Sequence, residues 1–170
     1  ANQIAAGEVI ERPANVVKEL LENSLDAGAT QIDIQFRSGG ISFIRVSDNG
    51  CGMDRSDAEL CFKRHATSKL KHIEDLQSLH SFGFRGEALP SIASVSKIHL
   101  YTRSKRQDLG IEIESEAGHI TRKKPFACPP GTTFTIEQLF YNIPVRRKFL
   151  KSEATESAHI INQVRLYALA

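Results

Sequence analysis

Two polar side chains one helical turn apart, Glu19 and Asn23, have the residue types and spacing best suited to chemistry in this sequence. A carboxylate can accept a proton from an attacking water molecule. A neutral amide oxygen can bind Mg²⁺, which keeps several waters and shares phosphate oxygens with a substrate. Such a pair would suit hydrolysis of a nucleoside triphosphate. A solvated helix face carries the same residue types, so the spacing alone leaves that alternative open.

The segment that carries this pair is predicted to be an amphipathic helix. Pro13 stands where a first helical residue would, and Gly28 stands where a C-terminal cap would. At roughly 100° per residue, Glu19 and Asn23 then project together from the boundary between core and water. The apolar residues that define the buried face are Val16, Val17, Leu20, Leu21 and Leu25.

The segment SDNGCGMD could supply the adenine end of a nucleotide site. A strand is predicted to end at Asp48, whose carboxylate could accept a hydrogen bond from an exocyclic amine such as that of adenine. Gly50 and Gly52 free the backbone and would let a ring approach closely. Asp-Asn-Gly is also an ordinary turn sequence. A Rossmann site is disfavoured because Arg55 stands where a third glycine would be, and no P-loop motif occurs.

Two further segments could contact a nucleotide. In SFGFRGEAL, Gly83 and Gly86 bracket a Phe-Arg dipeptide directly before a predicted helix, so backbone N–H groups and the helix dipole could receive phosphate oxygens. An ordinary glycine-containing turn is the alternative. In PPGTTFTI, either Thr132 or Thr133 could offer a hydroxyl group.

The elements that must position these residues predict an α+β fold. Besides the helix from residue 13, we expect a hairpin of strands 31–36 and 41–48 and a helix over 54–65 with Asp54 as its N-cap. A two-layer sandwich of a mixed, mostly antiparallel sheet with helices on one face fits this order better than a doubly wound parallel sheet. The remaining predicted elements are a helix at 87–95, strands at 97–102, 109–115 and 132–138, and helices at 144–151 and from 152.

The composition predicts one domain over residues 1–170, and the unfinished helical pattern at the C-terminus and the absence of an initial Met suggest a piece of a longer protein. Three cysteines without CxxC spacing indicate reduced thiols in a cytosolic protein.

A net charge of +2 does not by itself indicate a nucleic-acid partner, so local basic clusters must indicate one. The candidate clusters are Arg103, Lys105 and Arg106, then 122–124, then Arg146, Arg147, Lys148 and Lys151. Each cluster could also be a solvated face.

Taken together and in order, these segments resemble the ATP-binding motifs of the GHKL (Bergerat-fold) superfamily, which includes type II topoisomerase subunits, chaperones, sensor histidine kinases and the MutL family. NQIAAGEVIERPANVVKELLENSLDAGAT, DNGCGM, RHATSKL, GFRGEAL and LFYNIPVRRKFL are similar, nearly word for word, to the bacterial MutL family of DNA mismatch repair proteins. The resemblance covers essentially the whole chain.

The resemblance implies a role for each matching residue. Glu19 would be the general base, Asn23 the Mg²⁺ ligand, and Asp48 the reader of the adenine amino group. Gly50 and Gly52 would lie beneath the ring, and an ion pair of Glu22 with Arg85 is a further guess. The other implied ATP contacts are Thr67, Ser68 and Lys69 in a lid, Gly83, Phe84, Arg85 and Gly86 around the phosphates, and Thr133 at the adenine end.

The resemblance also implies a function for the longer protein. ATP binding and slow Mg²⁺-dependent hydrolysis would drive N-terminal homodimerisation and couple the mismatch-recognition protein MutS to a downstream nuclease or helicase. The protein would also bind DNA weakly and without sequence specificity. It would act in the bacterial cytoplasm, without a membrane partner. A lysine from a following subdomain would complete the hydrolytic site. Another GHKL protein, such as a chaperone, topoisomerase subunit or histidine kinase, and a non-catalytic nucleic-acid-binding domain remain the alternatives.

Overall fold

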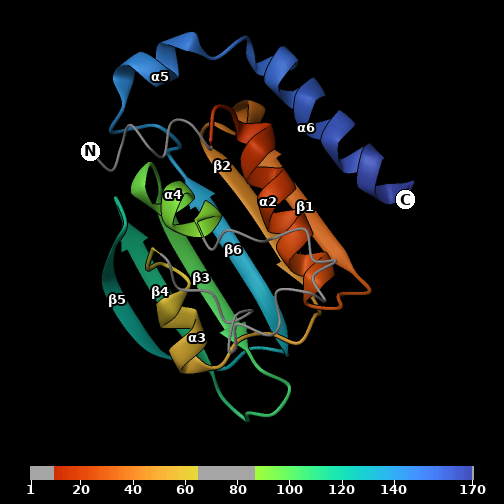
Figure 1. Ribbon diagram of the computed structural model, residues 1–170, viewed down its shortest axis with the longest axis vertical. Helices are drawn as coiled ribbons and strands as arrows, with labels where there is room; N and C mark the ends of the chain where they lie inside the picture. Colours follow the sequence, from red (N-terminus) through yellow and green to blue (C-terminus); the bar gives the residue numbers. More distant parts are fainter. Residues whose placement is uncertain (1–9, 65–86, 170) are drawn as a thin grey trace, which may run out of the picture.

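The computed structural model describes residues 10–64 and 87–169, which form a sheet of six strands with helices against it (Figure 1). The strand order is β1-β2-β6-β3-β4-β5, and all the neighbouring strands pair antiparallel. The strands are β1 (Ile32–Arg37), β2 (Phe43–Asp48), β3 (Lys97–Arg103), β4 (Gly110–Glu116), β5 (His119–Phe126) and β6 (Gly131–Glu137).

The helices α2, α3 and α4 lie over one face of this sheet, and α6 runs alongside α2 (Figure 1). Helix α2 packs on β2, while α3 and α4 pack on β4. Their bounds are α2 (Pro13–Asp26), α3 (Arg55–Leu60), α4 (Ala88–Ser94), α5 (Pro144–Phe149) and α6 (Glu153–Ala168), with a short 3₁₀ turn, η1 (Ser38–Gly40). The prediction of an α+β sandwich with a mostly antiparallel sheet is confirmed.

The core lies between α2, α4 and the sheet, and it is built by alternation along the strands. In β2, Ile44 and Val46 are buried while Phe43 and Arg45 face the other side of the sheet and are only half-buried. The same alternation in β3, β4 and β6 buries Ile98, Leu100, Ile111, Ile113, Phe134 and Ile136. Burial of this apolar surface holds α2 at a fixed position over the sheet.

The turn between β1 and β2 lets α2 and α6 approach each other closely. Gly40 has a φ of +86°, and a Cβ there would lie 2.7 Å from the Cβ of Pro13 and 2.9 Å from Cδ1 of Ile160. A side chain at this position would therefore separate the start of α2 from the middle of α6. The glycine is required both by the left-handed backbone and by the packing.

The structure differs from the sequence-based prediction at a few places. Strand β5 was not predicted, because its basic residues are mostly exposed and do not alternate with apolar ones. Leu25 is 46% exposed although the helical pattern placed it on the apolar face. The three cysteines are free thiols, as predicted. Among the helices that the structure describes, none combines the length and apolarity needed to cross a membrane.

Candidate functional site

Helix α2 places Glu19 and Asn23 at the edge of the core, as the helical pattern predicted. Both residues are half-buried, whereas Leu20 and Ser24, which follow them in the chain, are buried. The helix begins at Pro13, and the side chain of Asn15 accepts hydrogen bonds from the backbone N–H groups that precede the helix. The two polar groups are thus carried on a helix whose start and buried face are both fixed.

Asp48 at the end of β2 is tied to the C-terminal half of α2. Its Oδ2 accepts a hydrogen bond of 2.9 Å from the hydroxyl of Ser24, and its Oδ1 accepts one of 2.9 Å from the backbone N–H of Gly50. Ser24 directly follows Asn23 in the helix. The structure therefore brings the predicted adenine-reading aspartate next to the helical turn that carries the predicted metal ligand.

The glycines of the DNGCG segment are required by close approaches of the backbone. A Cβ on Gly50 would lie 2.8 Å from the Cβ of Ala27, at the end of α2. Gly52 has a φ of +67°, and a Cβ there would lie 1.9 Å from the carbonyl oxygen of Arg103 in β3. Hydrogen bonds from Cys51 N–H to the Ala27 carbonyl and from Lys105 N–H to the Cys51 carbonyl hold the loop between α2 and β3. The loop therefore lies against both elements, with no space for a side chain at Gly50 or Gly52.

Thr133, predicted to support the adenine end, is not brought together with the Asp48 carboxylate. Its hydroxyl lies 2.7 Å from that of Ser47, on the opposite face of the sheet. Thr132 is instead the residue paired with Asp48 across β2 and β6, and its hydroxyl lies 2.9 Å from that of Thr102. Because successive side chains of a strand alternate between faces, only one of the two threonines can share the face of Asp48. The alternation makes that residue Thr132.

Glu19 has an electrostatic environment suited to a base. Burial, and then the negative charge of Glu22, raise its pKa, while Lys18 acts in the opposite direction. Glu22 is itself buried, which the helical pattern did not predict, because helix α6 covers this side of α2. A carboxylate with a raised pKa accepts a proton more readily than an ordinary surface glutamate.

Several predicted contacts lie outside the described residues. These are the whole of the expected lid and phosphate segments, namely Thr67, Ser68, Lys69, Gly83, Phe84, Arg85 and Gly86. The guessed ion pair of Glu22 with Arg85 lies outside them for the same reason. The residues that the structure does place at this end of the fold are therefore Glu19, Asn23, Asp48, Gly50 and Gly52, together with Thr132.

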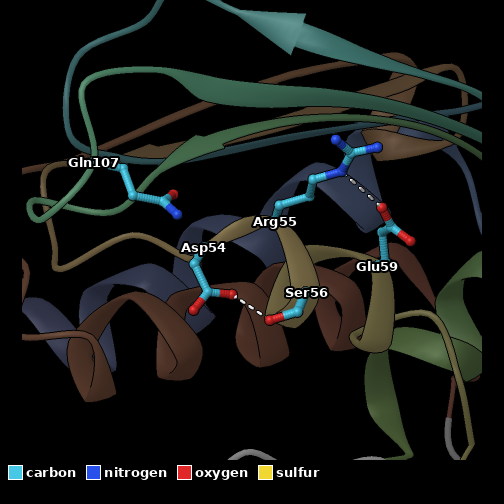
Figure 2. Close-up of a pocket in the computed structure, with 5 residues that line it drawn as sticks. All are labelled: Asp54, Arg55, Ser56, Glu59 and Gln107. Carbon is cyan, nitrogen blue, oxygen red and sulfur yellow. Dashed lines mark hydrogen bonds and ion pairs between the residues drawn. The ribbon is translucent and has the colours of Figure 1, made fainter.

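An open pocket of about 390 Å³ lies elsewhere, at the start of α3 (Figure 2). Its lining residues are Asp54, Arg55, Ser56, Glu59 and Gln107. The carboxylate of Asp54 accepts hydrogen bonds from the N–H of Asp57 and the hydroxyl of Ser56, which lower its pKa, and so it serves as the predicted N-cap. Arg55 and Glu59 form an ion pair of 3.3 Å. These polar groups are used in holding α3, and none of the predicted site residues lines this pocket.

A cluster on the face of the sheet opposite α2 has the residue types of a metal site. His99, Glu112 and Glu114 offer ligand atoms that lie within 4.8 Å of one another. However, the two oxygens of Glu112 lie 2.8 Å from Nε2 of His99 and 2.7 Å from Nζ of Lys124. Arg122 lies 3.6 Å from Glu114. Because cationic side chains of the protein already neutralise both carboxylates, the cluster does not need a metal ion.

The chain belongs to the family of histidine kinase-, DNA gyrase B- and HSP90-like ATPases. The family model described as "Histidine kinase-, DNA gyrase B-, and HSP90-like ATPase" matches residues 10–133, which is more than half of the chain. The matched range contains α2, the DNGCG segment and the start of β6, and so it includes every site residue placed above.

Within this family the chain is similar to MutL, as the sequence motifs predicted. It is 59% identical over all of its 170 residues to DNA mismatch repair protein MutL of Opitutus terrae and 56% identical to that of Acidobacterium capsulatum. It covers 27% and 26% of those proteins, so it spans about a quarter of the length of the curated relatives it matches.

Solved structures agree with this similarity. The Aquifex aeolicus MutL ATPase domain complexed with ADP is 41% identical with a TM-score of 0.73, over 95% of this chain and 56% of that one. An N-terminal domain of a DNA repair protein is 35% identical with a TM-score of 0.82, over 98% of this chain and 48% of that one.

Proposed function

We propose that this chain binds ATP with Mg²⁺ and that it belongs to the ATPase region of a DNA mismatch repair protein, in which a lysine from a following subdomain completes the site for hydrolysis. The observation that carries the proposal is the hydrogen bond between Asp48 and Ser24, which holds the Asp48 carboxylate beside the helix that carries Glu19 and Asn23. The family match and the MutL structure with ADP support the choice of nucleotide.

Asp48 would read the adenine amino group. A carboxylate has about four lone-pair positions. The Ser24 hydroxyl and the Gly50 N–H each use one of them, so at least one position remains to accept a hydrogen bond from an exocyclic amine. An ionised carboxylate accepts hydrogen bonds and has none to donate, which favours adenine over a base with a carbonyl at that position. Thr132, rather than Thr133, would support this end of the nucleotide.

Glu19 would accept the proton of the attacking water. Its raised pKa makes it a stronger base than a surface glutamate, and half-burial at the edge of the core keeps it in reach of solvent. A histidine kinase transfers its phosphoryl group to a histidine and needs no such base, so Glu19 favours hydrolysis. Glu19→Ala in the full-length protein should leave ATP bound and unhydrolysed.

Asn23 would hold Mg²⁺ through its amide oxygen. A single neutral oxygen on a half-buried helix face fits a metal that keeps several waters and binds phosphate oxygens. The bound ion would neutralise charge on the phosphates. We assign the remaining phosphate and lid contacts to Gly83, Phe84, Arg85 and Gly86 and to Thr67, Ser68 and Lys69, on the resemblance of their motifs.

Equilibrium binding of a non-hydrolysable ATP analogue, with and without Mg²⁺, tests the proposal. Asn23→Ala should lose the Mg²⁺-dependent part of the binding. Asn162→Ala is the matched control, because Asn162 is an exposed amide on another helix, α6. The assignment of Asn23 would be contradicted if the parent protein bound the analogue equally well with and without Mg²⁺, or if Asn162→Ala lost as much affinity as Asn23→Ala.

In the full-length protein, we propose that ATP drives N-terminal homodimerisation and that hydrolysis reverses it. By similarity to bacterial MutL, this cycle would take place in the cytoplasm and would couple MutS to a downstream nuclease or helicase. Analytical ultracentrifugation with the analogue tests the first part, since the dimer should appear only when nucleotide is bound.

Weak, non-specific DNA binding is a second proposed activity, and two of the three candidate clusters differ in their ion pairs. In the 122–124 cluster, Arg122 and Lys124 are ion-paired with acids, and Lys123 lies 2.9 Å from Glu59 of α3. On and after α5, by contrast, Arg147, Lys148 and Lys151 are exposed. We therefore assign the phosphate contacts to the cluster on and after α5 rather than to the 122–124 cluster.

Salt-dependent binding of a DNA duplex tests the assignment. The logarithm of the DNA-binding constant falls linearly with the logarithm of the salt concentration. Replacing Arg147 and Lys148 by Ala should make this slope shallower by about 0.9 for each phosphate that is no longer neutralised. Lys123→Ala should leave the slope unchanged. The opposite pattern would move the DNA-binding surface to β5.

A further inference from the structure

Helix α6 brings a tyrosine hydroxyl to the buried acid beside Glu19. The hydroxyl of Tyr167, in the last turn of α6, donates a hydrogen bond to Oε1 of Glu22. The Glu22 side chain is 7% exposed, and the ammonium group of Lys18 lies 3.9 Å from the same oxygen. A buried carboxylate is costly without a partner, so the tyrosine hydroxyl has an energetic role here.

The position of Tyr167 follows from how α6 packs on α2 (Figure 1). Ile160 is fully buried and would contact any side chain at Gly40, and Val164 packs against the core. Tyr167 lies seven residues after Ile160 and therefore on the same face of α6. The Ser152 hydroxyl caps the start of the helix by accepting from Thr155 N–H. The Tyr167 hydroxyl is thus positioned by a helix that is held at its start and at its buried residues.

Glu22 lies three residues after Glu19, so the two carboxylates are neighbours on one side of α2. The charge of Glu22 is the second cause, after burial, that raises the pKa of Glu19. Glu19 in turn contributes to the raised pKa of the Tyr167 hydroxyl, after burial and Glu22. The hydroxyl therefore stays protonated and remains a donor at neutral pH. The three groups form one electrostatic unit that joins α6 to the candidate base.

We propose that Tyr167 is a positioning residue for ATP hydrolysis: its hydroxyl holds the buried Glu22 carboxylate on the α6 side of α2 and so fixes the charge that Glu19 experiences. This inference rests on the proposed function of Glu19. Without the hydroxyl, the Glu22 carboxylate loses this hydrogen bond, and any movement of its charge changes the electrostatic environment of Glu19. Asp48 is held through Ser24 and Gly50, so nucleotide affinity should not depend on Tyr167.

Tyr167→Phe in the full-length protein tests the inference, because it removes one oxygen atom and keeps the ring. We expect kcat for ATP to fall by about three- to tenfold, while the Kd for ATP changes by less than about twofold. Tyr141→Phe is the matched control. Its hydroxyl also donates to a glutamate, Glu116, at 3.3 Å, but in an exposed place away from α2. The control should keep the parent kcat.

A double-mutant cycle shows whether Tyr167 acts through Glu22. In the Glu22→Gln background, Tyr167→Phe should change kcat by less than about twofold, because the charge that it positions is absent. A general weakening of the fold would lower the thermal midpoint and the nucleotide affinity as well as kcat, and it would persist in that background. A parent-level kcat in Tyr167→Phe, a parallel loss of affinity, or an undiminished effect in the Glu22→Gln background would each overturn the inference.

The failure of this inference and that of the proposed function can be told apart. If the parent protein does not hydrolyse ATP, or if Glu19→Gln retains the parent rate, the proposed function itself is wrong and Tyr167 has no reaction to serve. If the parent is active, Glu19→Gln is inactive and Tyr167→Phe equals the parent, only the role of Tyr167 is wrong.

Discussion

Substitution of Gly52 by alanine should damage the fold far more than the same change at Gly28, although the two glycines have nearly the same backbone conformation. Gly52 has a φ of +67° and Gly28 a φ of +70°. A left-handed conformation costs a non-glycine residue roughly 1–2 kcal/mol, and this applies to both. A Cβ at Gly28 would meet nothing within 4 Å, whereas one at Gly52 would lie 1.9 Å from the carbonyl oxygen of Arg103.

The clash at Gly52 cannot be relieved by turning a side chain, because the atoms that a Cβ would meet are backbone atoms of Arg103 and Gly131. Either the loop or the end of β3 must move by more than an ångström. Such overpacking costs about 1–3 kcal/mol, so we expect a total loss of roughly 2–5 kcal/mol at Gly52 and roughly 1–2 kcal/mol at Gly28.

Urea unfolding of the two variants, followed by circular dichroism, measures the difference between their free energies of unfolding. The expected result is that Gly52→Ala is the less stable by at least about 1 kcal/mol and that it also loses ATP affinity, because the loop carries the residues that would lie beneath the base. Equal losses in the two variants would refute the argument that this loop must touch β3.

Three further predictions concern the acids and thiols. Asp48→Asn should weaken ATP binding by about 10- to 100-fold in isothermal titration calorimetry, whereas Asp33→Asn, at an exposed position in β1, should not. Because burial raises the pKa of Glu19, its protonated form stabilises the fold below the ordinary value of 4.5, and that stability is lost as the pH rises through the raised value. Glu19→Gln should therefore increase the free energy of unfolding at pH 7, with no gain at pH 4, and a loss at pH 7 would contradict this. Burial raises the pKa of Cys61 to about 12, so a disulfide reagent should modify the exposed Cys51 in the native protein and leave Cys61 unreacted.

The regular elements could be predicted where sequence pattern and burial coincide. Helix α2 begins at Pro13 as expected and ends two residues before Gly28. The N-cap of α3 is Asp54, and that of α6 is Ser152, where the helix was expected to begin. In each case a local side-chain or backbone preference sets the boundary, so the sequence alone contains the signal.

The features that the sequence did not predict depend on contacts between distant segments. Glu22 lies on the polar side of α2 by the helical pattern, and only the packing of α6 makes it buried. Strand β5 pairs with β4 through its backbone, although its side chains are largely exposed and show no alternation of apolar and polar residues.

The sequence also could not show which of the two threonines of β6 lies on the same face of the sheet as Asp48, and the reason is different. Thr132 and Thr133 are chemically identical, and motif order cannot say which one faces α2. The register between Asp48 and Thr132 decides it. A prediction that followed the alternation back from the buried Phe134 would have found the same answer, since residues two apart in a strand share a face.

The most direct test of the account is a crystal structure of the chain with Mg²⁺ and a non-hydrolysable ATP analogue. We expect the amide oxygen of Asn23 at about 2.1 Å from the metal ion, and the carboxylate of Asp48 within hydrogen-bond distance of the adenine amino group. Glu19 should face the terminal phosphate across a water molecule. A nucleotide bound instead at the pocket of Asp54 and Gln107, or one that leaves Asn23 and Asp48 without contact, would contradict the account.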